Sequence, residues 1–163
     1  MSDQPQPRVI PRTAGQSVWW SRESVMTVKL DAETSGGSLA FGEQFCPPGY
    51  ETPLHVHADH DEVLIHREGA IDVHYDGEVY ASEPGDAVYL PSGVPHGFRA
   101  GTEGPAAVYV LYEPGLERGF LDCGIPADVD AGELPTPPAG LDVSEKLTGM
   151  DVFDTEIVGT LPD

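Results

Sequence analysis

The stretch Gly49–Gly69, GYETPLHVHADHDEVLIHREG, decides the fold. It places His55 and His57 two residues apart and follows them, after a polar turn, with Glu62. Side chains at positions i and i+2 of a β-strand project from the same face, so the two imidazoles can meet at one point. Glu62 can return a carboxylate to that point from the neighbouring strand. Because two histidines and a carboxylate suit a divalent first-row metal, the stretch predicts a metal site on a β-hairpin.

The composition of the whole chain narrows the class of protein. Its 163 residues are enough for one domain with its own core, and 8 basic against 28 acidic residues give a formal charge of −20. This charge disfavours nucleic acids and anionic membranes as partners, whereas it attracts cations. The sequence shows neither a secretory signal nor an apolar run of about 18 residues. Cys46 and Cys123 lie far apart, which predicts free thiols and a cytoplasmic protein.

Short apolar segments, separated by turns about every ten residues, predict an all-β fold. The abundant glycine and proline, 19 and 16 residues, suit such turns, and Asp76-Gly77 is a strong signal for a tight hairpin. No helices alternate with the strands, so an antiparallel sandwich or barrel is expected. The expected strands are Val25–Leu30, Ser38–Phe45, Leu54–His57, Glu62–Arg67, Ile71–Tyr75, Glu78–Ala81, Ala87–Leu90, His96–Arg99 and Ala106–Tyr112.

The two ends of the chain differ from this central part. Residues 1–16 form an N-terminal arm and residues 17–113 the barrel. Residues 114–163 are expected to pack on the outside of the barrel as a partly helical, proline-rich strap, and disorder from residue 126 onward is the alternative. Within the strap, Leu116–Cys123 predicts two helical turns, and Asp142–Glu145 has the pattern of a helix start.

A second motif, Gly85–Ala100 (GDAVYLPSGVPHGFRA), adds His96 after a rigid turn. The spacings Gly49-x5-His55-x-His57-x4-Glu62-x6-Gly69 and Gly85-x5-Pro91-x-Gly93-x2-His96, fifteen residues apart, resemble the two motifs of the cupin superfamily. Ala100 stands where the family usually has asparagine, a position that is not a ligand. A looser similarity over residues 17–160 resembles small bacterial monocupins of the quercetin 2,3-dioxygenase-like kind; it rests on VWW, ETSGG and EPGLERGF.

The resemblance implies a single antiparallel jelly-roll barrel in which His55, His57, Glu62 and His96 bind one metal. This donor set lacks thiolates, suits Fe, Mn, Ni, Co, Cu or Zn, and leaves one or two positions for substrate and dioxygen or water. The resemblance further implies a dioxygenase acting on an enolisable or phenolic, flavonol-like or polyketide-like molecule, with Glu62 as catalytic proton acceptor. A non-redox cyclase, isomerase or lyase and a module that binds a small ligand without turnover remain alternatives.

Inward strand positions should form the wall of a substrate pocket. Parity along the strands selects Phe41, Leu64, Val88, Leu90, Phe98 and Val110. His66 shares the parity of Glu62 and either faces the substrate or is a hydrogen-bonded core histidine.

The other aromatic and imidazole side chains receive structural interpretations. His60 is expected in a solvated turn and His74 on the surface, whereas Trp19 and Trp20 are expected in core or interface packing. Cupins commonly pair through barrel edges, so the resemblance also implies a homodimer, with the arm 1–16 lying across the partner.

Overall fold

The computed structural model describes residues 7–129, 135–141 and 155–163. Helical segments in these ranges are η1 (Ser21–Glu23), α1 (Ala32–Ser35) and α2 (Glu117–Cys123). The strands are β1 (Gln16–Trp19), β2 (Val25–Leu30), β3 (Ala40–Cys46), β4 (Leu54–His57), β5 (Glu62–Glu68), β6 (Ile71–Tyr75), β7 (Glu78–Ser82), β8 (Ala87–Leu90), β9 (His96–Ala100), β10 (Ala106–Tyr112), β11 (Ile125–Pro126) and β12 (Thr155–Gly159). The nine expected strands are all present, so the all-β prediction is confirmed.

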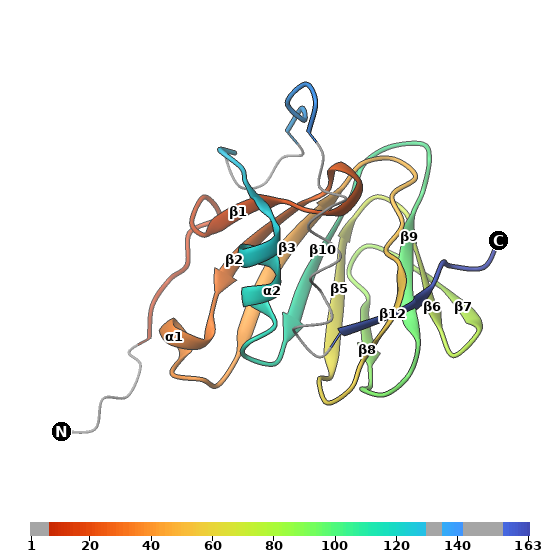
Figure 1. Cartoon of the computed structure of the whole chain (residues 1–163), viewed down its shortest axis with the longest axis horizontal. Coiled ribbons are helices and arrows are strands. Elements are labelled where there is room, and N and C mark those ends of the chain that lie inside the picture. Colours follow the sequence, from red (N-terminus) through yellow and green to blue (C-terminus); the bar gives the residue numbers. More distant parts are fainter. Residues whose placement is uncertain (1–6, 130–134, 142–154) are drawn as a thin grey trace.

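Two antiparallel sheets face each other (Figure 1). The large sheet has the order β11-β1-β2-β3-β10-β5-β8, and the small sheet has the order β12-β4-β9-β6-β7. The predicted hairpin between β6 and β7 is confirmed, because Asp76 and Gly77 have φ angles of 52° and 81°. Positive φ at both central residues matches the right-handed twist of the flanking strands, and glycine adopts it without steric cost.

Apolar side chains fill the space between the sheets, and a second apolar cluster covers the outer face of the large sheet. This outer cluster contains Trp19, Val25, Phe45 and Ala107, with Ile125, Ala127, Val129 and Leu141 packed against it. The cluster explains why β3 carries Phe45 on its outward side. Parity had suggested that the apolar residues of β3 face inward, whereas the structure turns Gln44 toward the interior.

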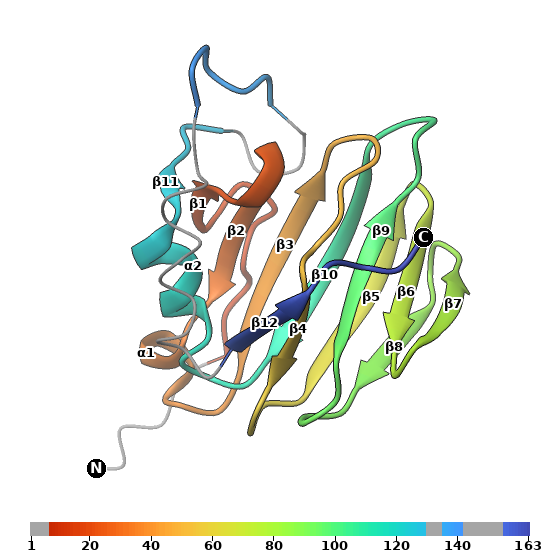
Figure 2. The same ribbon diagram turned by 45° about the vertical axis from the view of Figure 1, so that its right-hand side comes forward.

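The described parts of residues 114–163 contribute to both sheets. β11 pairs with β1 at one edge of the large sheet, and β12 pairs with β4 at one edge of the small sheet (Figure 2). Beyond β12, Arg99 donates a hydrogen bond to the carbonyl oxygen of Pro162. The helix predicted from Asp142 lies outside the described residues, and the division into arm, barrel and strap stays a prediction.

The described residues of the N-terminal arm lie against their own chain. Arg8 donates to the carbonyl oxygen of Thr34, and Lys29 donates to that of Arg12. Cys46 and Cys123 form no disulfide, as the sequence predicts. Among the described residues, no helix is long and apolar enough to cross a membrane.

Candidate metal centre

Three strands bring the four candidate metal ligands together. His55 and His57 project from the same face of β4, Glu62 begins β5 and His96 begins β9. β4 and β9 are neighbours, and His55 pairs with His96 in their register. One ligand atom from each of the four residues lies within 4.8 Å of the others. Ligands of one ion at about 2.1 Å lie at most about 4.2 Å apart, so a small contraction closes this cluster around a metal.

Hydrogen bonds orient the three imidazole rings. The Nδ1 atom of His55 is 2.8 Å from the carbonyl oxygen of Pro53, and that of His96 is 2.9 Å from the carbonyl oxygen of Val94. A carbonyl oxygen only accepts, so Nδ1 carries the hydrogen in both rings and Nε2 keeps a free lone pair. Thr155 Oγ1 lies 3.0 Å from Nδ1 of the third ring, His57. Such outer partners fix the tautomer in which imidazole binds metals.

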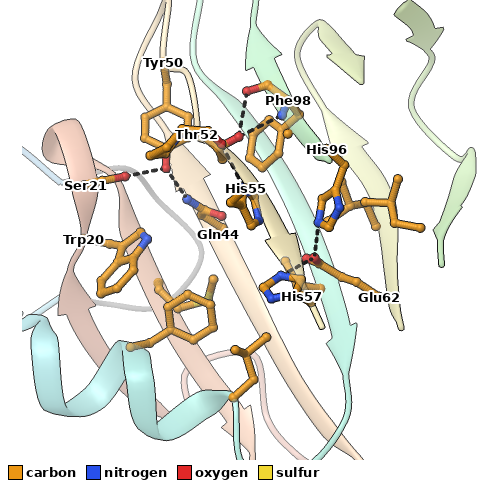
Figure 3. A pocket seen from close by; sticks show the side chains of 18 of the residues that line it. Trp20, Ser21, Gln44, Tyr50, Thr52, His55, His57, Glu62, His96 and Phe98 are labelled. Atoms are coloured by element: carbon orange, nitrogen blue, oxygen red, sulfur yellow. Dashed lines mark hydrogen bonds and ion pairs between the residues drawn. The ribbon is translucent and has the colours of Figure 1, made fainter. Parts of the chain in front are cut away.

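Glu62 faces two of these rings. Its Oε2 atom is 3.5 Å from Nε2 of His57 and 3.6 Å from Nε2 of His96 (Figure 3). Burial by itself raises the pKa of the Glu62 carboxyl, but the neighbouring imidazoles of His57 and His96 outweigh burial and hold the pKa below its usual value. Burial, reinforced by the other two histidines, lowers the pKa of His55 to about 4. A carboxylate and a neutral imidazole at neutral pH are the ionisation states that bind metals.

The cluster fits a divalent transition metal. Nε2 of His96 is buried and makes no hydrogen bond among the described residues. An unsatisfied buried lone pair is destabilising, and a metal ion would satisfy it. Three imidazole nitrogens and one carboxylate oxygen are borderline donors, which suit several first-row metals and select none of them.

The four residues line a cavity with mostly apolar walls. Together with the solvent space at its open mouth, the cavity measures about 690 Å³. Its aromatic walls include Trp20 and Phe120, whose rings meet edge to face at 5.0 Å, and Phe98. The arrangement suits a small apolar molecule with polar atoms directed at the four ligands.

Four of the pocket residues selected by parity line this cavity: Leu64, Leu90, Phe98 and Val110. Phe41, by contrast, lies on the outer face of the large sheet, 5.4 Å from the ring of Tyr109. Val88 packs against the core without reaching the cavity wall.

His66 also lies away from the cavity wall, as a buried histidine with Nδ1 3.0 Å from Ser82 Oγ. Parity selects a face of the sheet, whereas the cavity occupies only part of the length of that face. Of the two alternatives for His66, the geometry therefore matches a hydrogen-bonded core histidine and not a residue that faces the substrate.

Other side chains also depart from their expected places. His74 is 3 % exposed, although strand alternation placed it on the surface. Its partner across the sheet is Gly97, where a Cβ atom would lie 2.9 Å from Leu161, so the C-terminal segment lies over this region. Trp19 belongs to the outer cluster as core packing, while Trp20 lines the cavity. His60 is partly buried in the turn between β4 and β5.

Sequence reasoning missed the contribution of β12. In its register with β4, Thr155 pairs with His57 and Ile157 with His55. Thr155 thereby contacts a candidate ligand, and Ile157 lines the cavity. The available signal was the pair of β-branched residues at alternate positions in TEIVG, which is typical of a strand but too short to place it beside β4.

Residues 42–112 match the family model of the cupin domain. This part of the chain is a cupin domain. The jelly-roll barrel implied by the two sequence motifs is thereby confirmed, and both motifs of this cupin overlap the matched range.

Among curated proteins, this cupin is similar to quercetin 2,3-dioxygenase from Bacillus subtilis (strain 168), with 29 % identity over 93 residues. The match covers 57 % of this chain and only 27 % of that enzyme's length. Among solved structures, the polyketide cyclase RemF from Streptomyces resistomycificus has a TM-score of 0.60 at 18 % identity, covering 87 % of this chain and 99 % of RemF. A predicted oxalate decarboxylase from Thermotoga maritima has a TM-score of 0.61 at 18 % identity, covering 66 % and 99 %. At 18 % identity, the similarity to these two structures shows that this chain shares their fold.

Proposed function

We propose that this cupin is a metal-dependent dioxygenase that acts on an enolisable or phenolic ring compound. His55, His57, Glu62 and His96 would hold one divalent transition metal. The observation that carries the proposal is the position of this cluster, on the wall of an apolar cavity with its Nε2 atoms free of backbone partners. The similarity to quercetin 2,3-dioxygenase supports the choice of substrate class.

Different residues of the chain would have different roles in such a reaction. When bound, a transition metal supplies Lewis acidity toward an enol or phenol oxygen and, if redox active, electron transfer to dioxygen. Glu62 would accept the proton of that enol or phenol, since its Oε2 atom lies on the cavity side between two imidazoles. Trp20, Phe98 and Phe120 would hold the ring and keep water away from it.

Oxygen consumption tests the proposal. We expect at least one redox-active form, loaded with Fe, Mn, Ni, Co or Cu, to consume dioxygen and a flavonol-like substrate in equal amounts. The matched control is His96→Ala, which removes one ligand and should abolish both. The proposal is overturned if no metal form consumes either compound.

A non-redox cyclase, isomerase or lyase is the second candidate, because the thiolate-free donor set also suits Zn, which has no redox chemistry. Turnover by the zinc form under anaerobic conditions would support it over the dioxygenase. Recovery of a bound ligand unchanged after prolonged incubation would instead identify a binding module.

We further propose a cytoplasmic homodimer that pairs through the barrel edges. The edge strand β7 carries the exposed side chains of Val79 and Tyr80, and the edge strand β8 carries that of Tyr89. Trp19 and Trp20 are buried in their own chain and leave the pairing to these edges. Sedimentation at the monomer mass would contradict the dimer.

A further inference from the structure

A buried polar group lines the cavity on the side away from Glu62 and His96 (Figure 3). It consists of Ser21 at the start of η1, Gln44 on β3 and Tyr50 in the loop before β4, and we call it the polar end. The three side chains come from separate elements, and each residue is at most 4 % exposed. Buried polar groups in an apolar wall normally have all their hydrogen-bonding capacity used.

The orientation of the Gln44 amide follows from its neighbour Ser24. Ser24 Oγ donates its hydrogen to the carbonyl oxygen of Ser21 at 2.9 Å. It can then only accept from Gln44, so the Gln44 nitrogen, at 3.3 Å, faces it. The second hydrogen of Nε2 goes to the Tyr50 hydroxyl at 3.0 Å. Both amide hydrogens are thus used, and Oε1 accepts no hydrogen bond among the described residues.

The hydroxyl groups of Ser21 and Tyr50 leave one donor unused. Their oxygen atoms lie 2.7 Å apart, which is one hydrogen bond between two groups that each carry a hydrogen. Burial raises the pKa of Tyr50 to about 12, so its hydroxyl stays protonated at neutral pH. If Tyr50 donates, the Ser21 hydrogen makes no hydrogen bond among the described residues. If Ser21 donates, the Tyr50 hydrogen has only Ser24 nearby, whose Oγ already accepts from Gln44. The polar end therefore offers one spare donor and one spare acceptor, the Gln44 oxygen.

We propose that the polar end recognises a hydroxyl group at the far end of an aromatic substrate whose other oxygen reaches the metal ligands. A hydroxyl can accept from the spare donor and donate to Gln44 Oε1 at once, whereas a carbonyl or an ether can only accept. Trp20, Phe98 and Phe120 line the cavity and suit a flat ring. The inference rests on the proposed function and narrows its substrate class to rings with two separated oxygen functions.

Binding of matched ligands to the zinc-loaded protein under anaerobic conditions tests the inference without turnover. The probes are 3-hydroxyflavone, its 3,4′- and 3,7-dihydroxy relatives, and the methyl ethers of the two added hydroxyls. We expect one dihydroxy compound to bind about 10- to 100-fold more tightly than both 3-hydroxyflavone and its own methyl ether, because those leave buried polar atoms unpaired. Dissociation constants follow from quenching of tryptophan fluorescence, since Trp20 lines the cavity.

Variants test whether the spare donor and the spare acceptor, and not a general change in the fold, cause the preference for the dihydroxy compound. Ser21→Ala leaves the Tyr50 hydroxyl as donor and should keep the preference, whereas the double change Ser21→Ala and Tyr50→Phe should abolish it. Gln44→Met removes the spare acceptor and should reduce it. Thr52→Val is the matched control, because the Thr52 hydroxyl lines the same cavity but is fully used by the backbone N–H and carbonyl of Phe98. This control should keep the preference.

The outcomes distinguish the inference from the proposed function. Equal affinity of the wild type for all five compounds overturns the inference and leaves the proposed function standing. A preference that survives the double change also overturns the inference. No binding of any compound contradicts the flavonol-like substrate of the proposed function, and the inference fails with it.

Discussion

The carboxylates of Glu43, which is fully buried, and Glu62, which is mostly buried, lie on opposite faces of the large sheet. Glu43 faces outward, where it forms ion pairs with Lys29, at 3.5 Å, and Arg67. Glu62 faces the cavity, where its neighbours are the Nε2 atoms of two histidines. A buried carboxylate needs a cation. The cations beside Glu43 are side chains of the protein, so its role is structural. Glu62 instead faces imidazole nitrogens, and a bound metal ion would supply the missing cation.

The largest effect is expected for Glu43→Gln. The amide cannot neutralise Lys29, whose side chain is 4 % exposed, and the loss of one partner of a buried ion pair costs about 3–5 kcal/mol. We expect urea titration to show a decrease of that size in the free energy of unfolding. Glu51→Gln, in a pair with Arg99 whose two side chains are about 30 % exposed, is the matched control and should cost at most about 1 kcal/mol. Equal losses in the two variants would contradict the structural role of Glu43.

Glu62→Gln should weaken metal binding by more than about 100-fold, which exceeds the effect of losing an outer partner of a ligand. The absorption of bound Co(II), in competition with a chelator, measures this affinity. Metal bound at 100 times its dissociation constant stabilises a fold by about 2.7 kcal/mol. We expect this metal-dependent stabilisation to disappear in Glu62→Gln and to persist in Glu43→Gln. Its persistence in both variants would remove the distinction between the two carboxylates.

Thr155→Val should lower the metal affinity by about 10- to 100-fold, because valine keeps the shape of threonine and removes the hydrogen-bond partner of His57 Nδ1. Thr155→Ser restores a hydroxyl and should recover most of the affinity. The same Co(II) competition measures both variants. An unchanged affinity in Thr155→Val would mean that the strand β12 packs beside the site without orienting its ligand.

Ile157→Ala should have the smallest effect. Ile157 lines the cavity but is 41 % exposed, so its truncation is expected to cost less than about 1 kcal/mol of unfolding free energy. The metal affinity should stay unchanged, because the side chain contributes no ligand atom. Thermal unfolding with and without metal checks both expectations, and a loss of metal affinity would assign Ile157 a role in holding β4.

Local patterns predicted most of the sheets. The alternation in Ile71–Tyr75 and the Asp76-Gly77 turn specified a hairpin that the structure contains, because both signals act between neighbouring residues. The same reasoning misplaced Phe41 and His74. Each lies on a strand face that is covered or extended by side chains from distant parts of the chain, so alternation alone could not identify the inner face.

The sequence by itself determined the set of candidate metal ligands. The i, i+2 spacing of His55 and His57 and the short turn to Glu62 are local geometry, and His96 follows a rigid turn that the resemblance to cupins assigned. Only the tertiary structure decided what surrounds this set. Thr155 reaches His57 across 98 residues, and Ser21 reaches Tyr50 across 29. Such contacts depend on strand order and packing, which the pattern of neighbouring residues does not encode.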